Sequence, residues 1–317
     1  MFFVSKADLD KRVRLMRARL QEIGISDSLR GWNWDKPPVS SMYGDLYVSV
    51  SEVAGRYCET LRDIYLRRVL KIPVPFSIKL FDGIVLHRVA SETLTYVKRT
   101  LYSKGIMSGA DLIEELLPRA DDVCSKALEA GLKFGRPSDL ELETSKKKAL
   151  RLYRFLIVQA GSQLDLTLSK FPHAELDSVI SQAVPPIVER RVDGSLIGLS
   201  KELAVDIYVP AYAVVDLKTG EMRPFHKYAL TGYALALEAD EEVEVNYGFT
   251  IYLRVEPDKP HIKVRVKSVL IDDAIRKEFL DIRDEALRIV DTGADPGMPS
   301  RCPFYCPYYP VCHGGGR

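Results

Sequence analysis

The 317-residue sequence contains no apolar run close to the roughly 20 residues that a bilayer-spanning helix requires. Its first residues, MFFVSKADLDKR, lack the long apolar segment of a secretory signal. The chain shows no internal repeat and no long charged tail. From these absences we expect a globular cytoplasmic protein that has no membrane partner.

An excess of charge of either sign is also missing. The 45 Lys and Arg residues balance the 44 Asp and Glu residues, and the formal net charge is +1. This balance neither favours nor excludes a nucleic-acid partner, because only a local basic groove would bind phosphates. With 46% apolar and 28% charged residues, the chain can bury a substantial core and is long enough for one large domain or two smaller ones.

Cysteine is scarce, but three of the five cysteines crowd the last sixteen residues as Cys302-x3-Cys306-x5-Cys312. Cys58 lies near the other end of the chain, and Cys124, which has no cysteine neighbour, is expected to be an inert buried thiol. In a reducing compartment, clustered cysteines are metal ligands more often than disulfide partners. Four converging sulfurs would tie the two ends of the fold together, so the pattern predicts a metal clasp.

Two kinds of group could occupy this clasp. The x3 spacing lies within the range of structural zinc sites, and His313 could add a nitrogen ligand directly after Cys312. The Cys-Pro pairs at 302–303 and 306–307 suit an iron–sulfur cluster, since aromatic residues at 304, 305, 308 and 309 would screen it from solvent. The same aromatic side chains could instead fill the seam where the tail docks on the helical half.

The chain divides by its hydrophobic period. From Ala7 to about Leu168 the apolar residues recur at helical spacing, including residues 51–71 around Cys58. From about Ile187 the pattern predicts strands at 186–192, 203–209, 212–220, 243–255 and 261–271, a helix at 225–240 and a turn at 256–260. A last helix at 272–291 begins with two acids that favour its dipole. We expect three parts, namely a helical region at 1–180, an α/β core at 181–292 and a cysteine-rich clasp at 293–317.

Two acids and a lysine mark adjacent predicted strands. Asp206 lies inside the apolar run LAVDIYV, and the next strand carries Asp216-Leu217-Lys218. Because side chains alternate along a strand, Asp216 and Lys218 point the same way and Leu217 points the other. Carboxylates there suit Mg²⁺ or Mn²⁺, and the lysine could orient or deprotonate an attacking water, as phosphodiester hydrolysis requires. The triplet alone is also typical of a solvated strand end, but an acid inside an apolar strand needs a partner or a metal.

His87 lies in the helical half, among Ile84, Val85 and Val89. A histidine in this setting can be a satisfied core residue. It can also reach across to the two carboxylates and give a mixed site that favours Mn²⁺. The spacing leaves both interpretations open.

The order of these motifs resembles a known family. Gly83-x3-His87, Gly198-x7-Asp206, Asp216-x-Lys218 and a helix with Tyr233, closed by Cys58 and the C-terminal cysteines, resemble the RecB-type nucleases with an iron–sulfur clasp. Among these the chain is similar to the CRISPR-associated exonucleases of the Cas-four kind. The blocks LRGWNWDKPP and VSEVAGRYCETLRDIYLRRV resemble an archaeal subtype I-A relative, and the resemblance runs from Leu29 to Cys312.

The resemblance implies a restriction-endonuclease-like core with a helical N-terminal region and a C-terminal Fe–S clasp. It implies that Mn²⁺ or Mg²⁺ is bound by His87, Asp206, Asp216 and the carbonyl of Leu217, that Lys218 assists the water, and that Tyr233 lies near the scissile phosphate. It also implies a [4Fe–4S] cluster held by Cys58, Cys302, Cys306 and Cys312.

The chain departs from the family pattern at three points. Ala229 stands at the position of a family glutamine, Asp216 stands where relatives often carry glutamate, and the first cysteine spacing is x3 where many relatives have x2. His226 or Lys227 could position the DNA strand in place of the missing glutamine.

The implied function is metal-dependent exonucleolytic cleavage of DNA at single-stranded ends during CRISPR spacer acquisition, with other CRISPR adaptation proteins as partners. A basic run near the clasp, formed by Arg62, Arg67, Arg68 and Lys71, could line a DNA groove or be a solvated helix face. Two other functions stay open, a non-catalytic adaptor subunit of the adaptation complex and a zinc-stabilised nucleic-acid-binding module.

Overall fold

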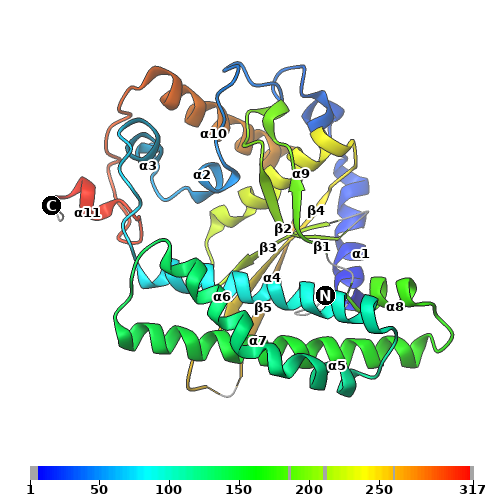
Figure 1. The fold of residues 1–317 in the computed structure, drawn as a ribbon. Helices are drawn as coiled ribbons and strands as arrows, with labels where there is room; N and C mark the ends of the chain where they lie inside the picture. Colours follow the sequence, from blue (N-terminus) through cyan, green and yellow to red (C-terminus); the bar gives the residue numbers. More distant parts are fainter. Residues whose placement is uncertain (1–5, 185–186, 210–212, 260, 315–317) are drawn as a thin grey trace.

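The computed structural model describes residues 6–184, 187–209, 213–259 and 261–314, and within these residues it is built around one five-stranded sheet (Figure 1). The strands follow one another across the sheet in chain order, as β1 (Ile187–Val192), β2 (Leu203–Val209), β3 (Ala213–Lys218), β4 (Tyr247–Arg254) and β5 (Lys263–Leu270). All neighbours pair antiparallel except β3 and β4, which are parallel and are connected by α9 (Lys227–Glu241). A parallel pair requires such a crossover. The predicted α/β class is therefore confirmed.

One face of the sheet is covered by a layer of long helices, below the sheet in Figure 1. Ser108 and Ser138 begin two of these helices with capping boxes, in which the serine and a following acid satisfy two backbone N–H groups. Phe81, Leu156 and Ile251 are fully buried in the core that the helices share with the sheet. The elements on this side are α1 (Lys6–Ile23), α4 (Ile78–Lys104), α5 (Gly109–Leu116), the 3-10 turn η4 (Leu117–Arg119), α6 (Ala120–Leu132), α7 (Asp139–Lys170) and α8 (Leu176–Ala183).

The opposite face is covered by α9, by α10 (Asp273–Thr292) and by the chain between residues 27 and 69. As predicted, an acid begins α10, since the Asp272 carboxylate accepts a hydrogen bond from the N–H of Ile275 at 3.1 Å. The shorter elements are η1 (Asp27–Leu29), η2 (Gly31–Asn33), α2 (Val50–Gly55), α3 (Arg62–Ile64), the π-helical turn η3 (Tyr65–Val69), η5 (Ser195–Ile197), η6 (Pro224–His226) and α11 (Tyr309–Cys312). The division of the chain at residues 180 and 292 stays a prediction.

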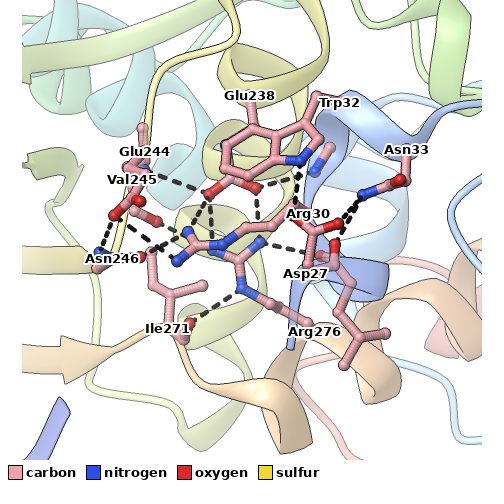
Figure 2. A network of polar contacts seen from close by, with 12 residues as sticks. Asp27, Arg30, Trp32, Asn33, Glu238, Glu244, Val245, Asn246, Ile271 and Arg276 are labelled. Carbon is pink, nitrogen blue, oxygen red and sulfur yellow. Dashed lines mark hydrogen bonds and ion pairs between the residues drawn. The ribbon is translucent and has the colours of Figure 1, made fainter. Parts of the chain in front are cut away.

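A buried ion network fixes the chain around residue 30 to this second core (Figure 2). Glu238 of α9 is fully buried and accepts hydrogen bonds from Arg30 at 2.8 Å and from Arg276 at 2.7 Å. The N–H of Gly31 donates to the same carboxylate at 2.9 Å. Only glycine fits there, because a Cβ on Gly31 would lie 2.1 Å from the carbonyl oxygen of Leu235. The LRGWNW block therefore has a structural role in anchoring the N-terminal segment to α9 and α10.

The helix predicted across residues 51–71 is wrong at Cys58. The chain leaves α2 at Gly55, and Arg56 and Leu61 adopt left-handed conformations with φ of 37° and 57° before α3 begins. Cys58 therefore lies in a loop. This loop is held by a contact that local spacing cannot reveal, because the Thr60 hydroxyl donates to the carbonyl of Gly297 at 2.7 Å.

The other predicted strands and helices occur near their expected positions. Pro186, Tyr212 and Pro260, which belong to predicted strands or to the predicted turn, lie outside the described residues, as do residues 1–5 of the predicted helical region and 315–317 of the predicted clasp. Cys124 is buried, and burial raises the pKa of its thiol to about 12, as expected for an inert cysteine. In the part of the chain that the structure describes, no helix combines the length and the apolar character of a membrane span.

Candidate active site and cysteine pocket

The two predicted acids meet where β2 and β3 separate. Pairing between these strands ends at Ile207 of β2 and Val215 of β3. The residues directly beyond this last pair are Asp206 on β2 and Asp216 on β3. Beyond this point the backbone N–H of Leu217 donates to Asp206 Oδ2 at 3.0 Å. The Asp206 carboxylate thus accepts the hydrogen bond that a backbone carbonyl of a paired strand would otherwise accept. This hydrogen bond fixes the carboxylate beside β3. The name "acidic site" is used below for Asp206, Asp216, Leu217 and Lys218 together with His87.

His87 reaches the acidic site from α4. Its Nε2 atom lies 2.9 Å from the carbonyl oxygen of Leu217 and 3.2 Å from Asp206 Oδ2. The flanking Val85 and Val89 are buried in the helical core, whereas the His87 side chain keeps 37% of its surface exposed. The structure therefore places His87 beside the carboxylate and away from the aliphatic core.

Asp216 has one carboxylate oxygen without a partner. Its Oδ1 atom accepts a hydrogen bond from the Lys218 ammonium at 2.8 Å. Its Oδ2 atom is buried and has no hydrogen-bond partner among the described residues. A buried anionic oxygen without a donor is costly, and such an oxygen fits a cation ligand. The donor set of two carboxylates, one carbonyl and one imidazole suits Mn²⁺ or Mg²⁺.

The protonation states in the acidic site differ strongly. Burial raises the pKa of Asp216 to about 6, although Lys218 opposes this shift. Burial also acts to raise the pKa of Asp206, but the charge and hydrogen bond of His87 outweigh it and hold that pKa at about 2. Burial acts to lower the pKa of His87, and the Asp206 carboxylate reverses this and raises it to about 9. Without a cation, His87 and Asp206 are therefore an ion pair at neutral pH.

Tyr233 and the residues around the missing glutamine lie on or just before α9. Burial, and then the charges of Asp206 and Asp216, raise the pKa of Tyr233 well above its ordinary value, so its hydroxyl stays neutral. Ala229 is buried and offers no polar group. Of the two proposed substitutes, Lys227 is paired with Glu278 at 2.6 Å, whereas His226 lies beside Tyr252, whose hydroxyl is 2.9 Å from its Nδ1 atom.

The four predicted clasp cysteines line one pocket. Cys58 comes from the loop before α3, and Cys302, Cys306 and Cys312 come from the C-terminal tail. The other lining residues are Tyr57, Arg62, Asp63, Pro299, Pro303, Tyr308 and Tyr309. This set is called the cysteine pocket below. His313, the predicted spare zinc ligand, does not line the pocket and stacks on Tyr309 at 4.3 Å between ring centroids.

Specific contacts dock the tail beside Cys58. Arg62 donates three hydrogen bonds to Asp295, at 2.9, 3.1 and 2.8 Å, and its Nη1 atom lies 3.6 Å from Cys312 Sγ. The Tyr308 hydroxyl donates to the carbonyl of Ile72 at 2.9 Å, and this side chain is almost fully buried. Tyr308 therefore fills the seam, whereas Phe304 is 85% exposed and does not.

Neither site is arranged for a metal ion as it stands. Among the described residues, no group of three or more His, Cys, Asp and Glu side chains could hold one. In the acidic site the Lys218 ammonium binds Asp216, and in the cysteine pocket burial raises the pKa of Cys306 to about 11 and keeps its thiol protonated. Binding of a metal group would require Lys218 to move and the thiols to lose their protons.

The predicted basic run is mostly paired inside the protein. Arg62 binds Asp295, and Arg67 and Arg68 lie 3.7 and 3.4 Å from the buried Glu52. These pairs involve three of the run's four cations, whereas the exposed Lys71 forms no ion pair within the described residues. The run therefore stabilises the docking of residues 52–68 more than it offers a groove.

An aromatic row that the sequence did not reveal connects the two sites. Tyr305 and Phe225 both contact Tyr57, with ring centroids 6.3 and 5.5 Å away. Phe225 contacts His226, which stacks on Tyr252 at 5.6 Å. These five residues, called the aromatic row below, come from four separate segments, so no sequence motif could have shown them together.

Comparison with known proteins shows which family the chain resembles along its length. The model of the CRISPR-associated exonuclease Csa1 family matches residues 1–316. The chain is 33% identical over 302 residues to the CRISPR-associated exonuclease Csa1 of Saccharolobus solfataricus, covering 94% of this chain and 97% of that protein. It is 32% identical over 289 residues to the protein of the same name from Thermoproteus tenax, covering 91% of each. A solved structure of a candidate exonuclease from Eubacterium rectale is 14% identical, covers 64% of this chain and 75% of that one, and has a TM-score of 0.33, which supports no conclusion.

Proposed function

The chain belongs to the CRISPR-associated exonuclease Csa1 family, and from this membership we propose that it is a metal-dependent deoxyribonuclease that trims single-stranded DNA ends in CRISPR spacer acquisition. Its partners would be DNA and other CRISPR adaptation proteins, and it would act in the cytoplasm. The proposed core is RecB-type and restriction-endonuclease-like. In support, the sheet places its two acids on the adjacent strands β2 and β3 and connects β3 to β4 through α9.

The observation that carries this proposal is the buried Oδ2 atom of Asp216, which lacks a partner among the described residues. Asp206, Asp216, the carbonyl of Leu217 and His87 would hold Mn²⁺ or Mg²⁺ there. The bound cation would supply Lewis-acid activation of the scissile phosphate and of water.

The side chains of the acidic site divide the remaining work. His87 must release its proton to solvent before its Nε2 atom can bind a cation, because the imidazolium has no free lone pair and Asp206 must stay a carboxylate to bind the same cation. Lys218 stays an ammonium, since the nearby carboxylates raise its pKa against the effect of burial. It would therefore orient water and counter phosphate charge, and it would not act as a base. Tyr233, held neutral beside the carboxylates, would donate a hydrogen bond to the phosphate.

For the cysteine pocket we propose a [4Fe–4S] cluster held by Cys58, Cys302, Cys306 and Cys312. All four cysteines line the same pocket, and the remaining lining residues include three tyrosines that would screen a cluster from solvent. The group would connect the C-terminal tail to the loop before α3, which otherwise depends on Arg62, Thr60 and Tyr308.

The proposed activity is tested on end-labelled single-stranded and duplex DNA with Mn²⁺, Mg²⁺ or EDTA. Wild-type protein purified without oxygen should degrade single strands only when a divalent cation is present, and Asp216→Asn should remove this activity. Asp258→Asn, on an exposed turn, is the matched control and should retain it. Metal-loaded wild type that degrades no DNA or RNA would overturn the nuclease proposal and favour the adaptor function, to which the buried Ala229 also points.

A further inference from the structure

Strand β5 carries an unusual distribution of charge. Its exposed side chains are Lys263, Arg265 and Lys267, and the strand contains no acid. Val264 and Val266 alternate with them and pack against the helical core. Side chains on one face of a strand recur about every 6.8 Å. The three cations, called the β5 cation row below, thus form an evenly spaced line on one face of the sheet.

The strand register places this row on the same face as the acidic site. Arg265 pairs with Tyr252 of β4, which pairs with Lys218 of β3. In the same way Lys267 pairs with Thr250, which pairs with Asp216. Directly paired residues point to the same face, and neighbouring strands lie about 4.8 Å apart. The β5 cation row therefore begins only about 10 Å from Asp216 and Lys218.

The three cations are free to bind an anion. None of them forms an ion pair with a carboxylate in the described part of the chain, whereas the nearby Arg254 and Lys259 are both held by Glu256. The Nη1 atom of Arg265 donates to the Met222 sulfur at 3.4 Å. Lysines on an edge strand also prevent pairing with another sheet, but that role does not require them to face a catalytic site.

The aromatic row leads from Tyr252 of β4, beside β5, past the acidic site to the cysteine pocket. It begins at Tyr252, which is directly paired with both Arg265 and Lys218. It ends at Tyr305, which is 45% exposed and lies under the Arg223 guanidinium at 3.8 Å from the ring centroid. Exposed rings beside cationic groups bind single-stranded nucleic acid, because unpaired bases stack on the rings while the cations bind phosphates.

From this arrangement we infer that the β5 cation row and the exposed end of the aromatic row form a binding track for one DNA strand. Phosphates bind Lys263, Arg265 and Lys267, the strand passes Lys218, and an unpaired base stacks at Tyr305. The β5 cation row lies along one β-strand, so it fits the sugar–phosphate backbone of one DNA strand. A base that is stacked within a duplex has no free face on which the Tyr305 ring could stack. This inference rests on the proposed nuclease function and names the path of its substrate.

The test measures binding without cleavage, by fluorescence anisotropy of a labelled single strand in EDTA at several salt concentrations. The variant is Lys263→Gln with Arg265→Gln and Lys267→Gln. The matched control removes three exposed lysines from the helical layer, as Lys133→Gln with Lys146→Gln and Lys147→Gln. The logarithm of the association constant falls linearly with the logarithm of the salt concentration, and each lost phosphate contact makes this slope shallower by ~0.7 for a single strand. The slope of the β5 variant should therefore be shallower than that of wild type by about 2, and the control should keep the wild-type slope.

Stacking is tested separately with Tyr305→Ala. This variant should weaken single-strand binding roughly tenfold at unchanged salt slope and should leave duplex binding unchanged. Wild type that does not bind the single strand, a β5 variant with the wild-type slope, or a control that loses as much as the β5 variant would each overturn the track.

Failure of the track and failure of the nuclease proposal give different results. The binding measurement in EDTA does not depend on catalysis. Binding that needs the β5 cation row, without any cleavage by wild type, would sink only the nuclease proposal. Metal-dependent cleavage with unaltered binding by the β5 variant would sink only the track.

Discussion

Asp206 Oδ2 accepts the backbone N–H of Leu217 at 3.0 Å, at the point where β2 and β3 cease to pair. The same carboxylate that ends the β2–β3 pairing lies 3.2 Å from His87 Nε2, where we propose that it binds the cation. Asparagine in its place keeps an acceptor oxygen but loses the charge. The two roles of Asp206 can therefore be separated by mutation.

Asp206→Asn should remain folded and lose Mn²⁺-dependent DNA degradation by roughly 10²-fold or more. Lys218→Ala should lose activity similarly, because its ammonium is the cation beside Asp216. The visible spectrum of the cysteine pocket should be unchanged in both variants, since the two sites use different residues. Full activity of either variant at saturating metal would contradict the assigned roles.

A variant at His87 distinguishes a ligand from a packing residue. The side chain is 37% exposed and contacts Asp206 and the Leu217 carbonyl, so its removal leaves no closed cavity. His87→Ala should therefore remain folded and lose roughly 10–100-fold in Mn²⁺ affinity. Calorimetric titration beside a melting curve measures both quantities. Unchanged Mn²⁺ affinity with a clearly lower melting temperature would make His87 a structural residue.

Local rules identified part of the acidic site from the sequence. Alternation along a strand placed Asp216 and Lys218 on one face, and an acid inside an apolar run singled out Asp206. The contact of His87 with Leu217 depends on where α4 crosses the sheet, and spacing along one helix does not contain that information. The relation of Lys267 to Asp216 depends on the register of three strands, which is set by long-range pairing.

The loop at Cys58 shows a second limit. Its apolar residues recur at helical spacing, yet the loop docks against Gly297 and the C-terminal tail. The left-handed conformations at Arg56, which ends α2, and at Leu61, which precedes α3, interrupt the helix that the spacing predicts. The grouping of the cysteines was nevertheless predictable, because a thiolate cluster that uses the three C-terminal sulfurs needs a fourth soft ligand from elsewhere in the chain.

Protein purified without oxygen should be brown, with visible absorbance and labile sulfide, because the four cysteines of the pocket would hold an iron–sulfur cluster. Cys58→Ser or Cys302→Ser should lower both this absorbance and the yield of soluble protein, since the cluster connects distant segments. Cys124→Ser is the control, because its buried thiol lies outside the pocket. Colourless wild type with stoichiometric zinc and no sulfide would replace the cluster with zinc.

The buried network in Figure 2 predicts a large loss of stability when its central acid is neutralised. Glu238→Gln would leave the buried Arg276 without a counter-charge and Arg30 with only the exposed Glu244 at 3.8 Å, and should cost roughly 3–5 kcal/mol of unfolding free energy. Glu241→Gln on the same helix removes a partly exposed pair with Arg190 and should cost about 1 kcal/mol or less. Chemical unfolding compares the two, and equal losses would show that the network contributes no more than a surface pair.

The raised pKa of Asp216 predicts that the buried Asp216 carboxylate destabilises the metal-free protein at neutral pH. Burial moves this pKa from 3.8 to about 6, so the folded protein binds the proton more tightly than the unfolded chain does. The stability due to this proton is fully present below pH 3.8 and is lost as the pH rises through about 6. In EDTA above that pH, Asp216→Asn should therefore be more stable than wild type, by up to ~3 kcal/mol.

The difference in stability between Asp216→Asn and wild type should vanish near pH 4, and Asp258→Asn should show no such difference at any pH. Urea unfolding at several pH values measures it, and an Asp216→Asn variant that is less stable than wild type at pH 8 would show that the Lys218 pair outweighs the cost of burial.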